Sequence, residues 1–265
     1  MIIAEIGWNH MGDISLAKNM ILEAKNAGCE YAKFQVWSVR NLRDGSWDSD
    51  GRREIYESAE LTENDLIILK DYCEATGIKF LVSIFSIKDT DKIKSLNLRS
   101  IKIPSTEATN KDLIKWVFSQ NFEKVFISTG CCSVEDLIFL RDNIKPEITT
   151  IMHCVSAYPC PLENVNLPRI SSLKNIFQDV GYSGHFDGIN DAIAALTLGA
   201  TYIEKHFTTD KSLPGRDNKF ALSPSEMKTL CRFEKDLISM KIDCGTAYQA
   251  IEQDMHDNYM GRWDA

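Results

Sequence analysis

The sequence lacks an excess of positive charge, a long apolar run and a basic start, and each lack excludes a class of protein. Its 30 Lys and Arg stand against 38 Asp and Glu, so the net charge is −8. Such a chain has no general electrostatic footprint for nucleic acid or an anionic membrane. The longest apolar runs, such as FLVSIF, are too short to cross a bilayer, and MIIAEIGWNH lacks the basic segment of a secretory signal. We therefore expect a cytoplasmic protein that binds neither nucleic acid nor membranes. A local basic pocket for a small phosphorylated substrate stays open.

Paired cysteines are also missing. The eight cysteines are scattered along the chain and form no CxxC motif. In a reducing compartment they stay as thiols, and free Cys is among the most often buried residue types. We interpret them as small side chains of the hydrophobic core.

Short β-prone runs are present, and amphipathic helical segments lie between them. This alternation predicts βα units around a parallel sheet, and eight such units predict a (β/α)8 TIM barrel. A chain of 265 residues fits a single domain of this kind. The predicted strands are 2–6, 30–36, 79–84, 100–104, 124–128, 149–154, 179–183 and 201–207. The predicted helices are 15–28, 61–77, 109–119, 133–142, 187–199 and 223–241. Thr62 and Asp65 predict a capping box, and Gly28 and Gly77 predict helix ends.

Two segments depart from the alternation. Residues 37–60 form a long polar connection after the second strand, on the side where barrels build active sites, and we expect a lid or substrate loop there. Residues 242–265 follow the predicted catalytic barrel, residues 1–241. We expect this tail to pack on the barrel or on a partner subunit.

Two of the five histidines, His185 and His206, lie where the seventh and eighth predicted strands end. All strand carboxyl ends of a parallel barrel lie at one face, so both side chains should project into one mouth. Two neutral imidazoles can share a divalent metal there and leave positions open for water and substrate oxygens. The alternative is that either His is a hydrogen-bonded core or loop residue.

Side chains with ammonium, carboxylate, amide and hydroxyl groups lie at the same strand ends. They are Glu5, Lys33, Gln35, Ser83, Lys102, Ser105, Glu107, Ser128, Ser156, Tyr158 and Ser183. A Lys charge with several hydroxyl donors is what phosphate oxygens require. A single Ser at a strand end is more often a turn or capping residue. Lys33 and Lys102 carry more weight, because an unpaired charge inside a barrel is strongly unfavourable.

Several motifs together make the chain resemble the sialic acid synthase family. Members of that family condense phosphoenolpyruvate with an acylamino sugar aldehyde. The matching stretches are IIAEIGWNHMGD, AKFQ, IKIPSTEATN, ISTG, HCVSAYP, GYSGHF, GATYIEKHFT and PGRDNKFALSP, and they extend from residue 2 to residue 224.

The resemblance implies specific roles for residues of this chain. A divalent cation is expected at the positions that match His185 and His206, with Mn²⁺ first and Mg²⁺ or Co²⁺ as alternatives. The resemblance also implies a homodimer. The expected phosphoenolpyruvate site comprises Lys33, Ser83, Lys102, Ser105, Ser128, Ser156 and Ser183. Acidic family positions near the reacting groups match Glu5, Glu107 and Glu204, and sugar-side positions match Gln35, Tyr158 and Asp217.

The implied reaction joins an N-acetylmannosamine-like aldehyde to phosphoenolpyruvate and gives a sialic-acid-like 2-keto-3-deoxy sugar acid. The metal polarises the aldehyde oxygen, and C3 of phosphoenolpyruvate attacks the carbonyl carbon. Water then captures C2, and phosphate leaves with C–O cleavage. We assign Glu107 to orient that water or to take its proton.

The chain also departs from the family pattern. Gly184 and Phe186 flank His185 where Asp and Thr are common, and Thr106 stands where Gly is usual. Family members usually carry a C-terminal antifreeze-like domain that supplies an Arg to the sugar pocket, and this sequence of 265 residues shows none. Either the sequence is a piece of a longer protein, or the tail or the long loop closes the site and another Arg substitutes; the tail YMGRWDA favours the second interpretation. One candidate is Arg216, in the stretch PGRD, where family members frequently have PGPD. The others are Arg40, Arg43, Arg52 and Arg53.

Two other classes of function remain open at this point. One is a barrel aldolase or lyase that forms a Schiff base at Lys102 or Lys33. The other is a non-catalytic relative that binds a sugar or a metal.

Overall fold

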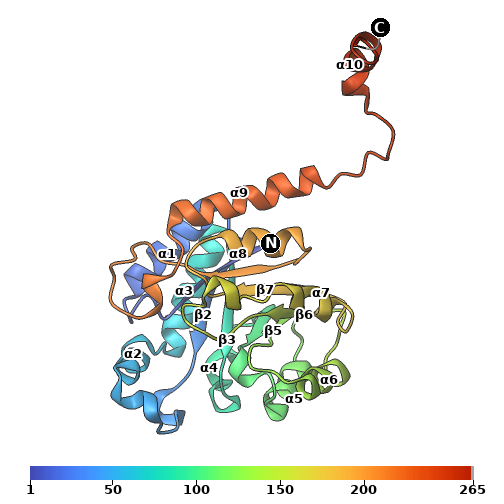
Figure 1. Ribbon diagram of the computed structural model, residues 1–265. Coiled ribbons are helices and arrows are strands. Elements are labelled where there is room, and N and C mark those ends of the chain that lie inside the picture. Colours follow the sequence, from blue (N-terminus) through green and yellow to red (C-terminus); the bar gives the residue numbers. More distant parts are fainter. Residues whose placement is uncertain (264–265) are drawn as a thin grey trace. The chain divides into compact units, whose positions relative to one another are not determined.

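Eight parallel strands form one closed barrel in the computed structural model, which describes residues 1–263 apart from the side chain of Trp47. Each strand pairs with its neighbours in chain order, and β1 closes the barrel against β8. Figure 1 shows the strands with helices around them. The strands are β1 (Ile2–Gly7), β2 (Tyr31–Val36), β3 (Lys79–Ile84), β4 (Ser100–Ile103), β5 (Lys124–Ser128), β6 (Thr149–His153), β7 (Val180–Gly184) and β8 (Ile203–His206). The predicted fold is confirmed, and the ends of the predicted strands differ from these by at most two residues.

Helices connect the strands. They are α1 (Ile14–Ala27), α2 (Arg52–Ala59), α3 (Glu63–Thr76), α4 (Asp91–Lys94), α5 (Lys111–Ser119), α6 (Val134–Asn143), α7 (Pro168–Lys174), α8 (Asn190–Thr197), α9 (Pro224–Met240) and α10 (Gln253–Asn258). The predicted capping box of α3 is present, with Thr62 and Asp65 bonding each other's backbone N–H. Gly28 and Gly77 end α1 and α3 in the left-handed conformation, as predicted.

Four short helices were not predicted, and the last of them, α10, lies in the tail, for which the sequence predicts no helix. α4 and α7 span only 4 and 7 residues, too short for a helical period to stand out. α2 lies inside the segment 37–60 that the sequence shows as a polar connection. It has few apolar residues, and its stability depends on tertiary contacts of Tyr56, whose ring lies 5.1 Å from that of Trp8 and 5.3 Å from that of Trp37.

The side chains inside the barrel form layers. An apolar layer fills the barrel on the amino-terminal side of the site. This layer consists of Ile3, Tyr31, Leu81, Phe126, Met152 and Tyr202. Side chains two positions apart on a strand share a face, so the next layer toward the carboxyl ends holds Glu5, Lys33, Ser83, Ser128 and Cys154. The fold therefore places a hydrophobic floor directly under a ring of polar side chains.

Gly181 on β7 allows the floor to pack closely. A Cβ atom there would lie 2.4 Å from Sδ of Met152 and 2.8 Å from the carbonyl oxygen of Tyr202. Both distances are shorter than any tolerated contact, so a side chain at this position would displace the Met152 side chain and the strand beside it.

The chain divides into two compact units, Met1–Glu234 and a second unit that begins at Lys235. The second unit contains the end of α9 and α10, where the ring of Tyr248 stacks on that of His256 with centroids 4.4 Å apart. The last two residues of the predicted tail, 264 and 265, lie outside the described residues. Packing of the tail on the barrel or on a partner stays a prediction.

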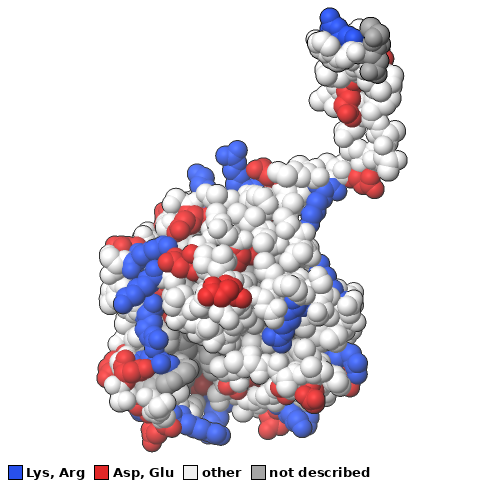
Figure 2. Space-filling model, in the orientation of Figure 1, with Lys and Arg blue, Asp and Glu red and all other residues white. Residues whose placement is uncertain are grey.

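The surface of the barrel unit is mixed in charge. Figure 2 shows Lys and Arg side chains interspersed with Asp and Glu side chains on the face that it draws. None of the helices in the described part of the chain has both the length and the apolar character that a bilayer crossing requires.

His10, in the turn after β1, should make the fold sensitive to acid. Burial lowers its pKa from 6.5 to about 4, and its Nδ1 accepts a hydrogen bond from the backbone N–H of Gly12. Between pH 6.5 and about pH 4 the unfolded chain binds a proton on this side chain that the folded chain does not bind, so the free energy of unfolding falls as the pH drops. We expect this group to remove about 3 kcal/mol of unfolding free energy between pH 7 and pH 4. Urea unfolding of wild type and His10→Gln at both pH values measures it, and equal losses in the two proteins would contradict the assignment.

Candidate active site

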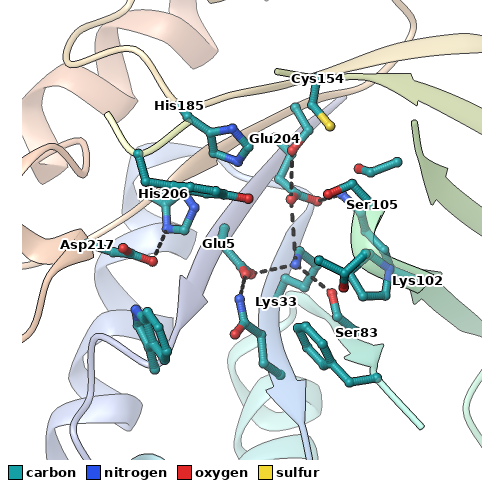
Figure 3. A pocket seen from close by; sticks show the side chains of 18 of the residues that line it. Glu5, Lys33, Ser83, Lys102, Ser105, Cys154, His185, Glu204, His206 and Asp217 are labelled. Carbon is teal, nitrogen blue, oxygen red and sulfur yellow. Dashed lines mark hydrogen bonds and ion pairs between the residues drawn. The ribbon is translucent and has the colours of Figure 1, made fainter. Parts of the chain in front are cut away.

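A cavity of about 180 Å³ opens at the carboxyl ends of the strands. Thirteen of the fifteen residues that the sequence analysis assigned to the site line it. They are Glu5, Lys33, Gln35, Ser83, Lys102, Ser105, Ser128, Tyr158, Ser183, His185, Glu204, His206 and Asp217. Figure 3 shows ten of the lining side chains by label, with Lys33 and its carboxylate partners at the centre.

Two lysines and two glutamates form a buried ion-pair network in the cavity. Nζ of Lys33 lies 2.8 Å from Oε2 of Glu5 and 3.5 Å from Oε1 of Glu204. Nζ of Lys102 lies 2.7 Å from Oε2 of Glu204. Each of the four residues is at most 5% exposed, and charges buried this deeply must be paired to be tolerated. The network balances two positive and two negative charges within the reach of a small ligand.

The two glutamates of the network have opposite pKa shifts. Burial would raise the pKa of Glu204, but the ammonium groups of Lys102 and Lys33 outweigh it and bring the pKa to about 2. Burial raises the pKa of Glu5, and the attraction of Lys33 only partly compensates. Glu204 therefore stays charged, whereas Glu5 is the carboxylate that accepts a proton more readily. Such a pair of unlike carboxylates is typical of acid–base sites.

Hydroxyl groups extend the network along the wall of the cavity. Ser83 Oγ accepts a hydrogen bond from Lys33 Nζ at 2.8 Å. Ser183 Oγ donates to Glu204 Oε1 at 3.1 Å. Ser105 and Ser128 line the cavity near Lys102 and Cys154, at the ends of β4, β5 and β6. This wall offers an ammonium group and several hydroxyl groups, which together suit phosphate oxygens.

Two predicted residues are not brought into the cavity. Glu107 lies in a 3-10 turn after β4, where its Oε2 accepts a hydrogen bond from Asn110 Nδ2 at 2.8 Å. It is not among the lining residues. Ser156 also lies outside the lining, and its hydroxyl contacts Ser105 Oγ at 2.9 Å. Ser156 therefore supports a lining hydroxyl, whereas Glu107 faces its own loop.

The predicted histidine pair lies together at the cavity, with ring centroids 5.5 Å apart. Nδ1 of His185 lies 2.8 Å from the carbonyl oxygen of Val155, which fixes the proton on Nδ1 and leaves Nε2 with a lone pair. Nδ1 of His206 lies 3.4 Å from Oδ2 of Asp217. A carbonyl partner on one ring nitrogen, as His185 has, is a usual arrangement of metal-ligating histidines, whereas the contact of His206 with Asp217 is not a hydrogen bond.

Electrostatics also suits the two rings to a metal ion. Burial lowers the pKa of His185 to about 4, and burial together with His185 lowers the pKa of His206 well below its usual value. Both rings are therefore neutral at pH 7, as metal ligation requires. Residues 1–263 contain no cluster of three His, Cys, Asp or Glu side chains arranged to hold a metal. The pair fits a divalent cation only if water or substrate oxygens complete the coordination.

Gly184, at the end of β7, lies where a side chain would not fit. A Cβ atom at this position would lie 2.4 Å from Oδ2 of Asp191 and 2.6 Å from the ring of Tyr182. Asp191 accepts a hydrogen bond from Tyr182 OH and pairs with Lys205 Nζ at 2.9 Å. The buried network of Tyr182, Asp191 and Lys205 therefore occupies the space that a side chain at this position would need.

Other lining residues were missed or were named only as candidates. They are Trp8, Arg52, Tyr56, Phe85, Pro104, Thr106, Cys154 and Arg216. The period of two along a strand places Cys154 on the same face as the interior Met152 and was sufficient to find it. Tyr56 and Arg52 had no such signal, because the helix that carries them, α2, was not predicted.

Comparisons with known proteins identify the family of this chain. The chain is 36% identical over 252 residues to N,N'-diacetyllegionaminic acid synthase of Campylobacter jejuni, covering 87% of this chain and 74% of that one. It is 37% identical over 244 residues to N-acetylneuraminate-9-phosphate synthase of Drosophila melanogaster, covering 86% of this chain and 65% of the relative.

A comparison with solved structures also finds a protein of this kind. The N-acetylneuraminic acid (sialic acid) synthetase of Leptospira borgpetersenii superposes with a TM-score of 0.85 at 28% identity, covering 98% of this chain and 92% of that one. The family model described as NeuB family matches residues 20–242. The chain therefore belongs to the NeuB family.

Proposed function

We propose that this protein condenses phosphoenolpyruvate with the aldehyde carbon of an N-acylated amino sugar, giving a 2-keto-3-deoxy sugar acid and phosphate. The observation that carries the proposal is the cavity itself. It places two buried ammonium groups, Lys33 and Lys102, in one pocket with a pair of neutral imidazoles. Membership of the NeuB family supports the same reaction.

In this proposal the wall of β4 to β6 binds phosphoenolpyruvate. Lys102, Ser105 and Ser128 hold its phosphate, which fixes C3 of the enol for attack on the aldehyde carbon. His185 and His206 would hold the divalent cation, Mn²⁺ by resemblance, which would supply Lewis-acid polarisation of the aldehyde oxygen. The acceptor then lies over β8, β1 and β2, between the imidazole pair and Gln35.

The two glutamates divide the later steps between them. A C–C bond forms, positive charge develops at C2, and water adds there before the C–O bond to phosphate breaks. Glu204, with its low pKa, stays ionised and stabilises the positive charge. Glu5, with its raised pKa, takes the proton from the added water. We move this role from Glu107 to Glu5, because Glu107 does not line the cavity.

The test is release of inorganic phosphate from phosphoenolpyruvate in the presence of Mn²⁺ and N-acetylmannosamine, with a mass measurement on the product. Release that requires all three components supports the proposal, and no release with any acylamino aldose favours the non-catalytic alternative. Borohydride with pyruvate separates the Schiff-base alternative: a covalent adduct on Lys33 or Lys102 would exclude condensation through an unmodified enol. The resemblance further supports a homodimer, which light scattering can examine.

A further inference from the structure

Two buried cysteine thiols meet at the amino-terminal end of the barrel. Cys29 directly follows Gly28, the residue that ends α1, and lies just before β2. Cys231 lies on the buried face of α9, next to Leu230. The two sulfur atoms are 3.9 Å apart, and the residues are only 5% and 2% exposed. The fold therefore brings into contact two thiols that are 202 positions apart in the sequence.

Backbone hydrogen bonds fix the position of Cys29. Gly28 has a φ of 102°, so the chain turns sharply out of α1 at this point. The backbone N–H of Cys29 donates to the carbonyl oxygen of Ala24 at 3.0 Å. The backbone N–H of Glu30 donates to the carbonyl oxygen of Ile2, in β1, at 2.9 Å. Cys29 is thus held between a helix end and a barrel strand, and its contact with α9 does not depend on a long loop.

The thiol pair lies beside the strand that closes the barrel. β1 pairs with β2 on one side and with β8 on the other. The ammonium group of Met1 donates to the carbonyl oxygen of Thr201 at 3.0 Å and pairs with Glu234 of α9. Glu234 follows Cys231 by three positions and lies on a neighbouring part of the helix surface. A bond between Cys29 and Cys231 would therefore join the elements that flank the amino end of β1.

The geometry and the chemical state of the pair suit a disulfide that forms slowly. The S–S bond measures about 2.05 Å, so the two sulfur atoms must approach by about 2 Å. Rotation about the Cα–Cβ bonds between staggered positions moves a sulfur atom by a distance of this order. The neighbouring thiol of Cys231 and burial hold the pKa of Cys29 well above its ordinary value. Cys29 is therefore protonated at neutral pH, and only a lasting excess of oxidant should convert it.

We propose that Cys29 and Cys231 form a disulfide in the presence of a peroxide, and that this bond closes the barrel covalently beside β1. Cys29 is the more exposed of the two, and hydrogen peroxide oxidises its thiol to a sulfenic acid with release of one water molecule. The sulfur of Cys231 then attacks the sulfur of Cys29. The S–S bond forms, the S–O bond breaks, and a second water molecule leaves with the thiol proton. Two electrons thus pass from the two thiols to one peroxide molecule.

The inference is independent of the proposed function. The pair precedes β2, whereas the cavity opens at the carboxyl ends of the strands. No substrate or metal ion is needed to form the bond or to detect it.

The first experiment identifies the bond by mass spectrometry. The whole protein is treated with hydrogen peroxide, its remaining thiols are alkylated, and it is digested with trypsin, which cleaves after Lys and Arg. Cys29 then lies in peptide 26–33 and Cys231 in peptide 229–232. We expect these two peptides to be linked after oxidation and to separate when dithiothreitol is added. The exposed Cys131 reports whether the peroxide has acted. Oxidation of Cys131 without the linked peptides would overturn the proposal.

The second experiment measures what the bond does to the fold. We expect the urea midpoint of the linked protein to rise by about 1–2 M, because closing a loop of this length restricts the unfolded chain. Dithiothreitol should restore the original midpoint, whereas it does not reduce methionine sulfoxide, so the bond is separated from other oxidation. An unchanged midpoint in linked wild type would refute the covalent closure, and this comparison needs no variant.

Alanine variants assign the shift to the pair. Cys29→Ala and Cys231→Ala should each lose both the linked peptides and the rise in the urea midpoint. Cys73→Ala is the matched control, because Cys73 is buried on α3 and contacts no other sulfur atom within residues 1–263. It should keep both effects. A rise in Cys29→Ala equal to that in wild type would show that another oxidation causes the shift and would reject the assignment.

Discussion

Lys102→Met should lower kcat/KM for phosphoenolpyruvate by about three orders of magnitude, because it removes a preorganised positive charge from a dry pocket. Lys102 is only 2% exposed, and its ammonium group shares the cavity with Ser105, Ser128 and Ser183. Met has nearly the same length, so the cavity keeps its shape while the charge is lost. Steady-state kinetics with phosphoenolpyruvate as the varied substrate measures the effect.

The fold should survive this substitution. Glu204, the partner of Lys102, keeps Lys33 at 3.5 Å and the hydroxyl of Ser183 at 3.1 Å, so its charge is not left unpaired. Removing one member of a buried ion pair costs about 3–5 kcal/mol when the other is stranded, and we expect less here. An urea titration of Lys102→Met separates lost activity from lost structure.

Lys205→Met is the matched control. Lys205 is buried to the same degree on β8, but it pairs with Asp191 at 2.9 Å and does not line the cavity. Its loss leaves Asp191 with the hydroxyl of Tyr182 but without its ammonium partner, so we expect a larger loss of stability than in Lys102→Met, about 3–5 kcal/mol, with most of kcat/KM retained. Lys102→Met should therefore lose activity more than stability, and Lys205→Met should lose stability more than activity. Equal activity in Lys102→Met and wild type would contradict the phosphate-binding role.

The parts of the site that could be predicted from sequence are those that a barrel strand fixes. Lys33, Lys102, His185 and His206 all lie on or directly after a strand, and the direction of a parallel strand decides where they point. The same rule placed Glu5 at the end of the first strand, whereas Glu204 was named from the family resemblance alone. The ion pairs between them follow from burial, because these charges must find partners inside the barrel.

The parts that could not be predicted belong to loops. Glu107 follows β4 by four residues, and a 3-10 turn directs its carboxylate to Asn110 instead of the cavity. No periodic pattern in the sequence fixes such a turn. The position of helix α2 could not be predicted either. It depends on ring contacts of Tyr56 with Trp8 and Trp37, which lie outside the helix in sequence. Arg52 could be named as a candidate, but only the structure places it at the rim.

His206→Gln should weaken the binding of Mn²⁺ by about 100-fold or more and lower turnover accordingly. Loss of a partner of a ligating His already costs about 10–100-fold in metal affinity, and loss of one of only two protein ligands should cost at least as much. His206 ends β8 and is 6% exposed, so a Gln side chain fits the site without opening it. Electron paramagnetic resonance of free Mn²⁺ measures binding directly, without reference to activity, and phosphate release at increasing Mn²⁺ gives the matching kinetic constant.

His153→Gln is the appropriate control for this prediction. His153 ends β6 and is fully buried, but its Nε2 lies 2.9 Å from the carbonyl oxygen of Val165 and it does not line the cavity. Its replacement should affect stability and leave the Mn²⁺ binding curve unchanged. If His206→Gln and wild type bound Mn²⁺ equally, the cation would have to sit elsewhere. The neutral rings of His185 and His206 would then serve only as hydrogen-bonding groups of the cavity wall. The polarisation of the aldehyde would need another source.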